Sequence, residues 1–144
     1  MDSLFGSFMQ TIPVPAPADF DYDALLRAHL EQIFNERDPD RRSAALVKLY
    51  HANAEMLDPE GSYIGLKAIS ERIDELLASF PEDFSFRADG RGLGLGNVAC
   101  LAWKLGAPAV EAAISGVDVV HLQDGRIKSV YVLIGADDQQ SREG

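Results

Sequence analysis

The spacing of the apolar residues changes at Pro81, and this change limits the possible folds more than any other feature of the chain. Before Pro81, apolar residues recur every three or four positions, which is the spacing of an amphipathic helix. After Pro81 they alternate with other residues, which is the spacing of a strand. Helices followed by strands predict an α+β fold, in which helices pack on one face of a mostly antiparallel sheet.

Three helices are expected ahead of this change. Asp21 and Asp40 are expected to cap the first two, because an aspartate side chain accepts hydrogen bonds from the free N–H groups at a helix start. The third helix should stop before Pro81, since proline cannot supply the next backbone hydrogen bond. The predicted ranges are 22–36, 41–51 and 66–79.

Five strands are expected, a short one before the third helix and four after it. The segment "QDGR" at 123–126 predicts a tight hairpin turn of the Asp-Gly type between the last two strands. The predicted strand ranges are 54–57, 83–89, 97–105, 110–122 and 126–134.

The strand predicted for residues 110–122 is apolar on both faces. Ile114 and Val120 lie on one face, and Val117 and Val119 lie on the other. Helices on one side of the sheet can cover only one of these faces. An uncovered apolar face is typical of a subunit contact, so the chain is expected to form a homodimer through the outer face of the sheet.

One domain is predicted, with a short extension at each end. Residues 1–20 read as an extended or disordered arm, because the prolines of "IPVPAPADF" disfavour a helix. Residues 21–135 form the domain, and residues 136–144 form a polar tail.

The charge balance excludes several classes of partner. The chain carries 13 basic and 23 acidic residues, a formal net charge of −10. Nucleic acids and anionic membrane surfaces select basic patches, so neither is an expected partner. No apolar run is long enough to span a membrane, and the first residues lack the basic start of a signal peptide, so a cytoplasmic location is expected. No metal site is expected, because neither a His-x-x-x-His pair nor a cysteine cluster is present.

Two aspartates stand in apolar surroundings. Asp118 lies inside "ISGVDVVHL", a strand that should be almost entirely buried, and a carboxylate there must line a cavity or have a partner. Asp58 ends the strand that carries Met56, and Pro59 follows it. The structural alternatives are a hydrogen-bonded carboxylate for Asp118 and a turn residue for Asp58.

Four segments together resemble the nuclear transport factor 2-like superfamily, and within it the branch of SnoaL-like polyketide cyclases and ketosteroid isomerases. These segments are "LVKLYHANAEMLDPEG", "GLKAISERIDELLASFP", "ISGVDVVHLQDGRI" and "VYVLI", and the resemblance covers about residues 20–134. It implies a cone-shaped fold, in which a strongly curved, mostly antiparallel sheet wraps around three helices and encloses an apolar pocket.

The resemblance also implies roles for both aspartates. Asp58 matches the general base of the isomerases, and Asp118 matches an aspartic acid that is kept neutral and donates a hydrogen bond to the developing oxyanion. Leu30 stands where those isomerases place a tyrosine on the first helix, which speaks against authentic steroid isomerase activity.

The function expected from these features is that of a cofactor-independent isomerase- or cyclase-like enzyme. Asp58 would remove a proton next to the carbonyl group of a small apolar substrate, and protonated Asp118 would stabilise the enolate. The residues expected to line the pocket are His29, Leu30, Phe34, Met56, Phe84, Phe86, Trp103, Val120, Val130 and Val132. The alternative is a dimeric ligand-binding or adaptor module without catalysis, since a fold does not determine a function.

Overall fold

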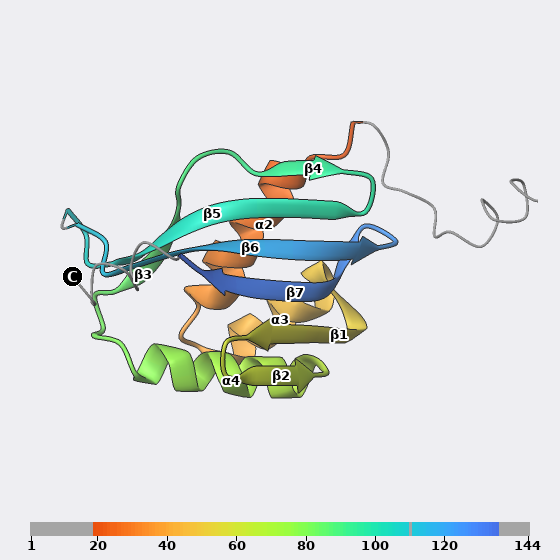
Figure 1. Ribbon diagram of the computed structural model, residues 1–144. Coiled ribbons are helices and arrows are strands. Elements are labelled where there is room, and N and C mark those ends of the chain that lie inside the picture. Colours follow the sequence, from red (N-terminus) through yellow and green to blue (C-terminus); the bar gives the residue numbers. More distant parts are fainter. Residues whose placement is uncertain (1–18, 110, 136–144) are drawn as a thin grey trace, which may run out of the picture.

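The computed structural model describes residues 19–109 and 111–135 of the 144-residue chain. Of the predicted arm, only residues 19 and 20 belong to this part, and the predicted tail, residues 136–144, lies outside it. The described residues form helices on one side of a curved, open sheet (Figure 1). The predicted α+β architecture is thereby confirmed.

The helical layer contains three α-helices within the described residues. They are α2 (Tyr22–His29), α3 (Pro39–Leu49) and α4 (Leu66–Ala78), and α2 continues directly into the π-helical turn η1 (Leu30–Phe34). The first predicted helix therefore changes its winding halfway along. The second helix begins two residues earlier than predicted and ends at Leu49.

The caps of the first two helices follow local sequence. Asp21 caps α2 as predicted, because its Oδ1 atom accepts a hydrogen bond of 2.9 Å from the Ala24 N–H. The prediction of Asp40 as the second cap is wrong. Asp38 holds that position and accepts from the Asp40 N–H at 2.9 Å, with Pro39 as the first helical residue. Proline suits this position, where its missing N–H has no partner to lose.

The sheet contains seven strands within the described residues. In chain order they are β1 (Tyr50–Asp58), β2 (Gly61–Ile64), β3 (Ser85–Ala88), β4 (Leu93–Leu95), β5 (Val98–Gly106), β6 (Ile114–Gln123) and β7 (Arg126–Ile134). The order across the sheet is β2-β1-β7-β6-β5-β3, and β4 also pairs with β5. The strand pairs are antiparallel except β1 and β7, which run parallel. The sheet is therefore mixed, and β1 is longer than the predicted 54–57.

The predicted hairpin between β6 and β7 is present. Asp124 and Gly125 have φ angles of 54° and 77°, the left-handed pair that a two-residue hairpin turn needs. The register of β6 on β7 shifts by one residue at a bulge between His121 and Leu122, and beyond it Asp118 lies opposite Val132 on β7. On the other side of β6, Asp118 lies opposite Leu101 on β5. Along β6 the inner residues Asp118, Val120 and Leu122 are buried, which places the Asp118 carboxylate between the sheet and the helices.

Candidate functional site

A cavity of about 330 Å³ lies between the sheet and the helical layer. Side chains from η1, α4 and five strands line it. Its wall is mostly apolar, and its polar members are two aspartates, one glutamate and one arginine. The lining residues are Phe34, Asp58, Pro59, Glu60, Arg72, Leu76, Phe80, Phe86, Trp103, Leu105, Ile114, Asp118, Val132 and Ile134. A concave apolar site with a few converging polar groups is typical of small-molecule binding.

Asp118 lines this cavity and has only 2% of its surface exposed. Its Oδ1 atom accepts a hydrogen bond of 2.8 Å from the indole Nε1–H of Trp103 on the neighbouring strand. Its Oδ2 atom lies 2.7 Å from His29 Nε2. Each carboxylate oxygen thus has a partner, which is what a buried carboxylate requires.

The contact with His29 continues to Tyr50 at the start of β1. The Tyr50 hydroxyl lies 2.7 Å from His29 Nδ1, and both side chains are fully buried. Burial raises the pKa of Tyr50 well above its ordinary value, and the charge of Asp118 adds to this effect. The phenol therefore keeps its proton at working pH. Tyr50, His29, Asp118 and Trp103 form a continuous buried chain of hydrogen bonds.

Asp58 lies at the turn between β1 and β2 and is held from two sides. Its Oδ1 atom accepts from the Glu60 N–H at 2.8 Å, which is the hydrogen bond of a turn residue. Its Oδ2 atom accepts from Arg72 Nε at 2.8 Å, and its side chain is 4% exposed. Asp58 is therefore a turn residue and also a member of the cavity wall.

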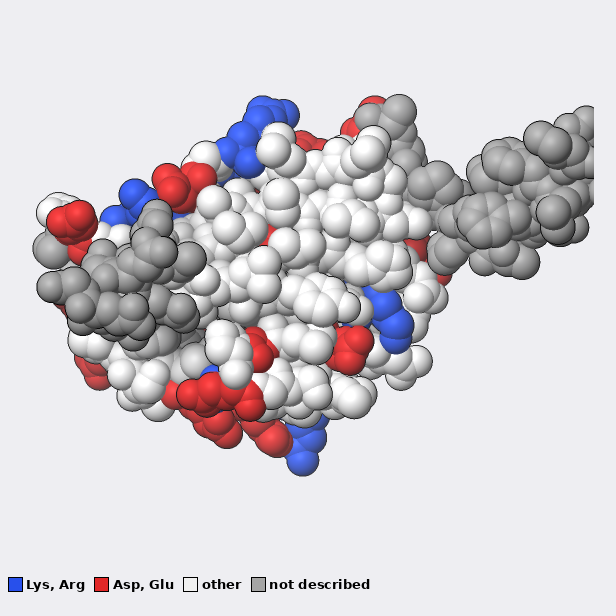
Figure 2. Space-filling view, viewed as in Figure 1, with Lys and Arg blue, Asp and Glu red and all other residues white. Residues whose placement is uncertain are grey.

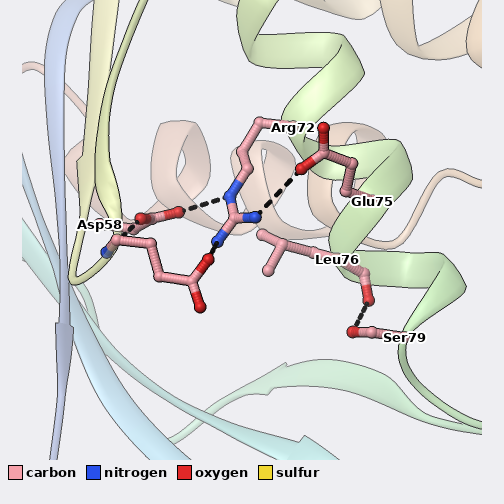
Figure 3. Close-up of polar contacts among 6 residues, drawn as sticks. Asp58, Arg72, Glu75, Leu76 and Ser79 are labelled. Carbon is pink, nitrogen blue, oxygen red and sulfur yellow. Dashed lines mark hydrogen bonds and ion pairs between the residues drawn. The ribbon is translucent and has the colours of Figure 1, made fainter.

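Arg72 enters the cavity from α4 and contacts three carboxylates. Besides Asp58, it reaches Glu60 through Nη2 at 3.1 Å and Glu75 through Nη1 at 3.2 Å. Figure 3 shows its guanidinium group between Asp58 and Glu75. Its burial opposes the charge, but the hydrogen bond and the charge of Asp58 outweigh that cost and raise the pKa of Arg72 above its ordinary value. The cavity therefore contains a permanent cation.

Six of the residues expected in the site line the cavity. They are the two aspartates and four of the predicted wall residues: Asp58, Asp118, Phe34, Phe86, Trp103 and Val132. The other six lie outside this lining. His29, Leu30, Met56, Val120 and Val130 are buried in the core, and Phe84 is partly buried and stacks on Phe80.

Sequence reasoning missed Arg72, the most informative member of the site. A signal was present, because Ile69 and Leu76 lie three positions before and four positions after it, and such residues share one face of a helix. A charged residue on the apolar face of α4 must reach a partner or a cavity. The missing information was the partner, which belongs to the distant β1–β2 turn.

The described residues contain no group of three or more histidine, cysteine, aspartate and glutamate side chains arranged to hold a metal ion. Within the same residues, no helix has both the length and the apolar character needed to cross a membrane.

Comparison with protein families gives one match that spans most of the chain. The model of the SnoaL-like domain matches residues 26–130. This range contains Asp58, Arg72 and Asp118, together with the buried residues His29 and Tyr50. No curated protein matches the chain.

Solved structures give the same picture. A candidate isomerase of the SnoaL-like family from Agrobacterium tumefaciens is 27% identical, with a TM-score of 0.73 over 80% of this chain and 97% of that one. A candidate SnoaL-like polyketide cyclase from Jannaschia is 11% identical, with a TM-score of 0.65 over 88% and 94%. An NTF2-like protein from Cytophaga hutchinsonii is 15% identical, with a TM-score of 0.59 over 87% and 99%. At such low identities the last two structures support the fold alone. The similarity of their folds confirms the predicted NTF2-like cone.

Proposed function

The chain belongs to the family of SnoaL-like domains, and from this premise and the geometry of the cavity we propose that it is a cofactor-independent acid–base enzyme of the isomerase or cyclase kind. Its substrate is a small, largely apolar carbonyl compound. One observation carries the proposal: the carboxylates of Asp58 and Asp118, 60 positions apart in sequence, line the same apolar cavity.

Asp118 is the better placed of the two to accept a proton. Proton uptake by Asp118 removes a charge from apolar surroundings, where a charge is costly. Proton uptake by Asp58 would instead break its ion pair and take away one of the charges that balance Arg72. The proposed roles therefore differ from the sequence-based expectation, in which Asp58 was the base and Asp118 the hydrogen-bond donor.

Arg72 supplies the positive charge that the reaction needs. Removal of a proton next to a carbonyl group moves negative charge onto the carbonyl oxygen, and a fixed cation in a cavity of low polarity stabilises that charge. A guanidinium group has five N–H donors, and contacts with Asp58, Glu60 and Glu75 use three of them. Asp58 then acts by holding Arg72 at the cavity wall.

The test is α-proton exchange in deuterated water, with β-tetralone and cyclohexanone as apolar ketone probes and NMR as the readout. We expect the purified protein to catalyse exchange, and Asp118→Asn to lower the rate by about 10²–10⁴-fold, the usual contribution of a positioned base. Asp58→Asn should lower it less. Asp23→Asn is the matched control, because Asp23 forms an ion pair with Arg27 away from the cavity. Circular dichroism verifies that each variant folds.

A ligand-binding module without catalysis is the second candidate. The observation in its favour is that every oxygen of Asp58 and Asp118 already has a donor within the protein. Binding of the ketones without exchange would favour this module. Exchange that Asp58→Asn abolishes and Asp118→Asn spares would restore Asp58 as the base.

We also propose that two copies of the chain pair through the outer face of the sheet. Figure 2 looks onto this face and shows a broad uncharged region over the strands, with charged side chains mainly near its edges. Large apolar side chains on this face are 42–86% exposed, which is unusual for a surface that stays in water. They are Ile64, Leu93, Leu95, Val98, Tyr131 and Leu133.

A further inference from the structure

Tyr50 and His29 do not line the cavity, but their hydrogen bonds lead to Asp118, which does. His29 is 0% exposed and uses both ring nitrogens, Nε2 toward Asp118 at 2.7 Å and Nδ1 toward Tyr50 at 2.7 Å. Its ring also packs edge-on against Phe34, at 4.9 Å between centroids. An imidazole that is fixed in this way has few possible arrangements of its hydrogens.

The hydrogens can be assigned by counting donors and acceptors. If Tyr50 donates its hydroxyl hydrogen to Nδ1, then Nε2 carries the imidazole hydrogen and donates it to Asp118. Trp103 donates to the other oxygen of Asp118, since an indole N–H can only donate. In this arrangement every polar hydrogen in the chain of contacts has an acceptor, and both oxygens of Asp118 accept, as those of an ionised carboxylate do.

The arrangements in which Nδ1 carries a hydrogen leave another buried hydrogen without a partner. If Asp118 were protonated and donated to Nε2, the imidazole hydrogen would lie on Nδ1 and point at the Tyr50 oxygen. A doubly protonated His29 would also place a hydrogen there. In both cases the Tyr50 hydroxyl hydrogen would have no acceptor among the described contacts of that group. Leaving a buried donor unpaired is costly. Tyr50 retains this hydrogen because burial and the charge of Asp118 both raise its pKa.

We propose that Tyr50 and His29 are positioning residues, which fix one imidazole tautomer and thereby hold Asp118 as a carboxylate with its free lone pairs toward the cavity. The inference rests on the proposed function, in which Asp118 is the base. When a substrate C–H bond breaks, its electron pair moves into the enolate and its proton goes to Asp118. Because Nε2 already carries a hydrogen, His29 cannot take this proton onward. The proton stays on the cavity side of Asp118 and can return to another carbon of the same substrate.

Among the described residues, the cavity wall contains three charged groups besides Asp118. Asp58 ends β1, Glu60 lies in the β1–β2 turn, and Arg72 comes from α4 and pairs with both of these carboxylates. These three lie in the wall of the cavity, whereas Tyr50 and His29 lie behind Asp118 in the core. The tautomer therefore depends on the two direct partners of the ring, the Tyr50 hydroxyl at Nδ1 and Asp118 at Nε2.

The experiment is nitrogen NMR of His29 in ligand-free protein at pH 7. His51→Gln and His121→Gln are combined first, so that His29 is the one remaining histidine. We expect resonances of a protonated Nε2 and an unprotonated Nδ1. Tyr50→Phe should move the two resonances toward each other as the second tautomer becomes populated. Tyr22→Phe, which removes a hydroxyl that donates to the Gly96 carbonyl, should change neither.

A protonated Nδ1 in the parent protein, or an unchanged tautomer in Tyr50→Phe, would overturn the inference. The ketone exchange rate is a second readout, and Tyr50→Phe should lower it by about tenfold, the equivalent of one hydrogen bond. The results distinguish a failure of the proposed enzyme activity from a failure of the proposed positioning role. Absence of exchange in the parent protein contradicts the enzyme and leaves the tautomer measurement valid. Exchange together with the wrong tautomer contradicts only the positioning role.

Discussion

The indole of Trp103 and the carboxylate of Asp118 are diagonal neighbours on the inner face of strands β5 and β6. Trp103 lies opposite Gly116, and Asp118 lies opposite Leu101, so the 2.8 Å hydrogen bond between them runs obliquely across the strand pair. Gly116 makes this possible, because a Cβ atom at that position would overlap the indole ring. The carboxylate therefore depends on a glycine two positions earlier in its own strand.

Replacement of Asp118 by asparagine should destabilise the protein, although the two side chains have nearly the same shape. The amide group carries two hydrogens on one side. It must therefore point an N–H group either at the N–H of Trp103 or at the Nε2–H of His29. An unmade hydrogen bond of this kind costs about 1–3 kcal/mol. Urea unfolding of wild type and Asp118→Asn measures the difference.

The same variant tests whether both oxygens of Asp118 accept hydrogen bonds. An Asp118 that donated a hydrogen to His29 would have one donor and one acceptor, and asparagine would reproduce that arrangement at little cost. A change below about 0.5 kcal/mol, the size typical of neutral surface substitutions, would therefore contradict the assignment of both oxygens as acceptors.

The position of Asp118 was predictable from sequence, but its partners were not. The apolar residues on both sides of Asp118 predict a buried strand, and Asp118 is buried in the structure. The sequence predicts His29 as a pocket-lining residue, whereas it is buried behind the cavity as a partner of Asp118. Its link to Asp118 joins residues 89 positions apart, and no local pattern contains that information. The π-helical turn after His29 also cannot be recognised in the sequence, because the apolar spacing continues through it.

Two other differences have local causes. Proline is favoured directly after a helix cap, so Pro39 favours Asp38 over the predicted Asp40 as the cap of α3. Turn residue and site residue are alternatives for Asp58 in the sequence, but its two oxygens serve both purposes. The choice between these alternatives depended on Arg72, whose contact with Asp58 forms only when α4 packs beside the β1–β2 turn.

Removal of Arg72 should cost stability because it leaves Asp58 without its charged partner. The side chains of Arg72 and Asp58 are 10% and 4% exposed, so water compensates little. We expect Arg72→Met to lower the free energy of unfolding by about 1.5–3 kcal/mol, the value of hydrogen bonds to charged groups. Arg72→Lys should recover part of this loss, since lysine keeps the charge but lacks the planar fork.

Lys67 on the same helix offers a matched control for this measurement. It lies 3.6 Å from Glu71 in an exposed pair, and such pairs contribute little to stability. Lys67→Met should change the free energy of unfolding by less than about 0.5 kcal/mol. Equal effects of Arg72→Met and Lys67→Met would show that the cluster around Arg72 is an ordinary surface contact.

The raised pKa of Tyr50 predicts a loss of stability at alkaline pH. Burial and the charge of Asp118 raise the pKa above the ordinary value of 10.0, so the folded protein holds this proton more tightly than the unfolded chain. The resulting stabilisation is complete below pH 10 and decreases above it, where the unfolded chain loses the proton first. Unfolding free energies measured between about pH 9 and pH 11 should therefore fall less steeply in Tyr50→Phe than in wild type. Coincident slopes would contradict the shift.

The proposed dimer predicts that one charge on the outer sheet face separates the subunits. Leu133 on β7 is 52% exposed and lies opposite Val117 on this face. A glutamate there would be buried against the partner without a counter-charge, which is strongly unfavourable. Leu133→Glu should therefore shift the mass in sedimentation equilibrium from two chains to one. Val47→Glu is the control, because Val47 is 61% exposed but lies on α3, away from the sheet face. A monomeric wild type, or a dimer that Val47→Glu disrupts and Leu133→Glu does not, would place any subunit contact elsewhere.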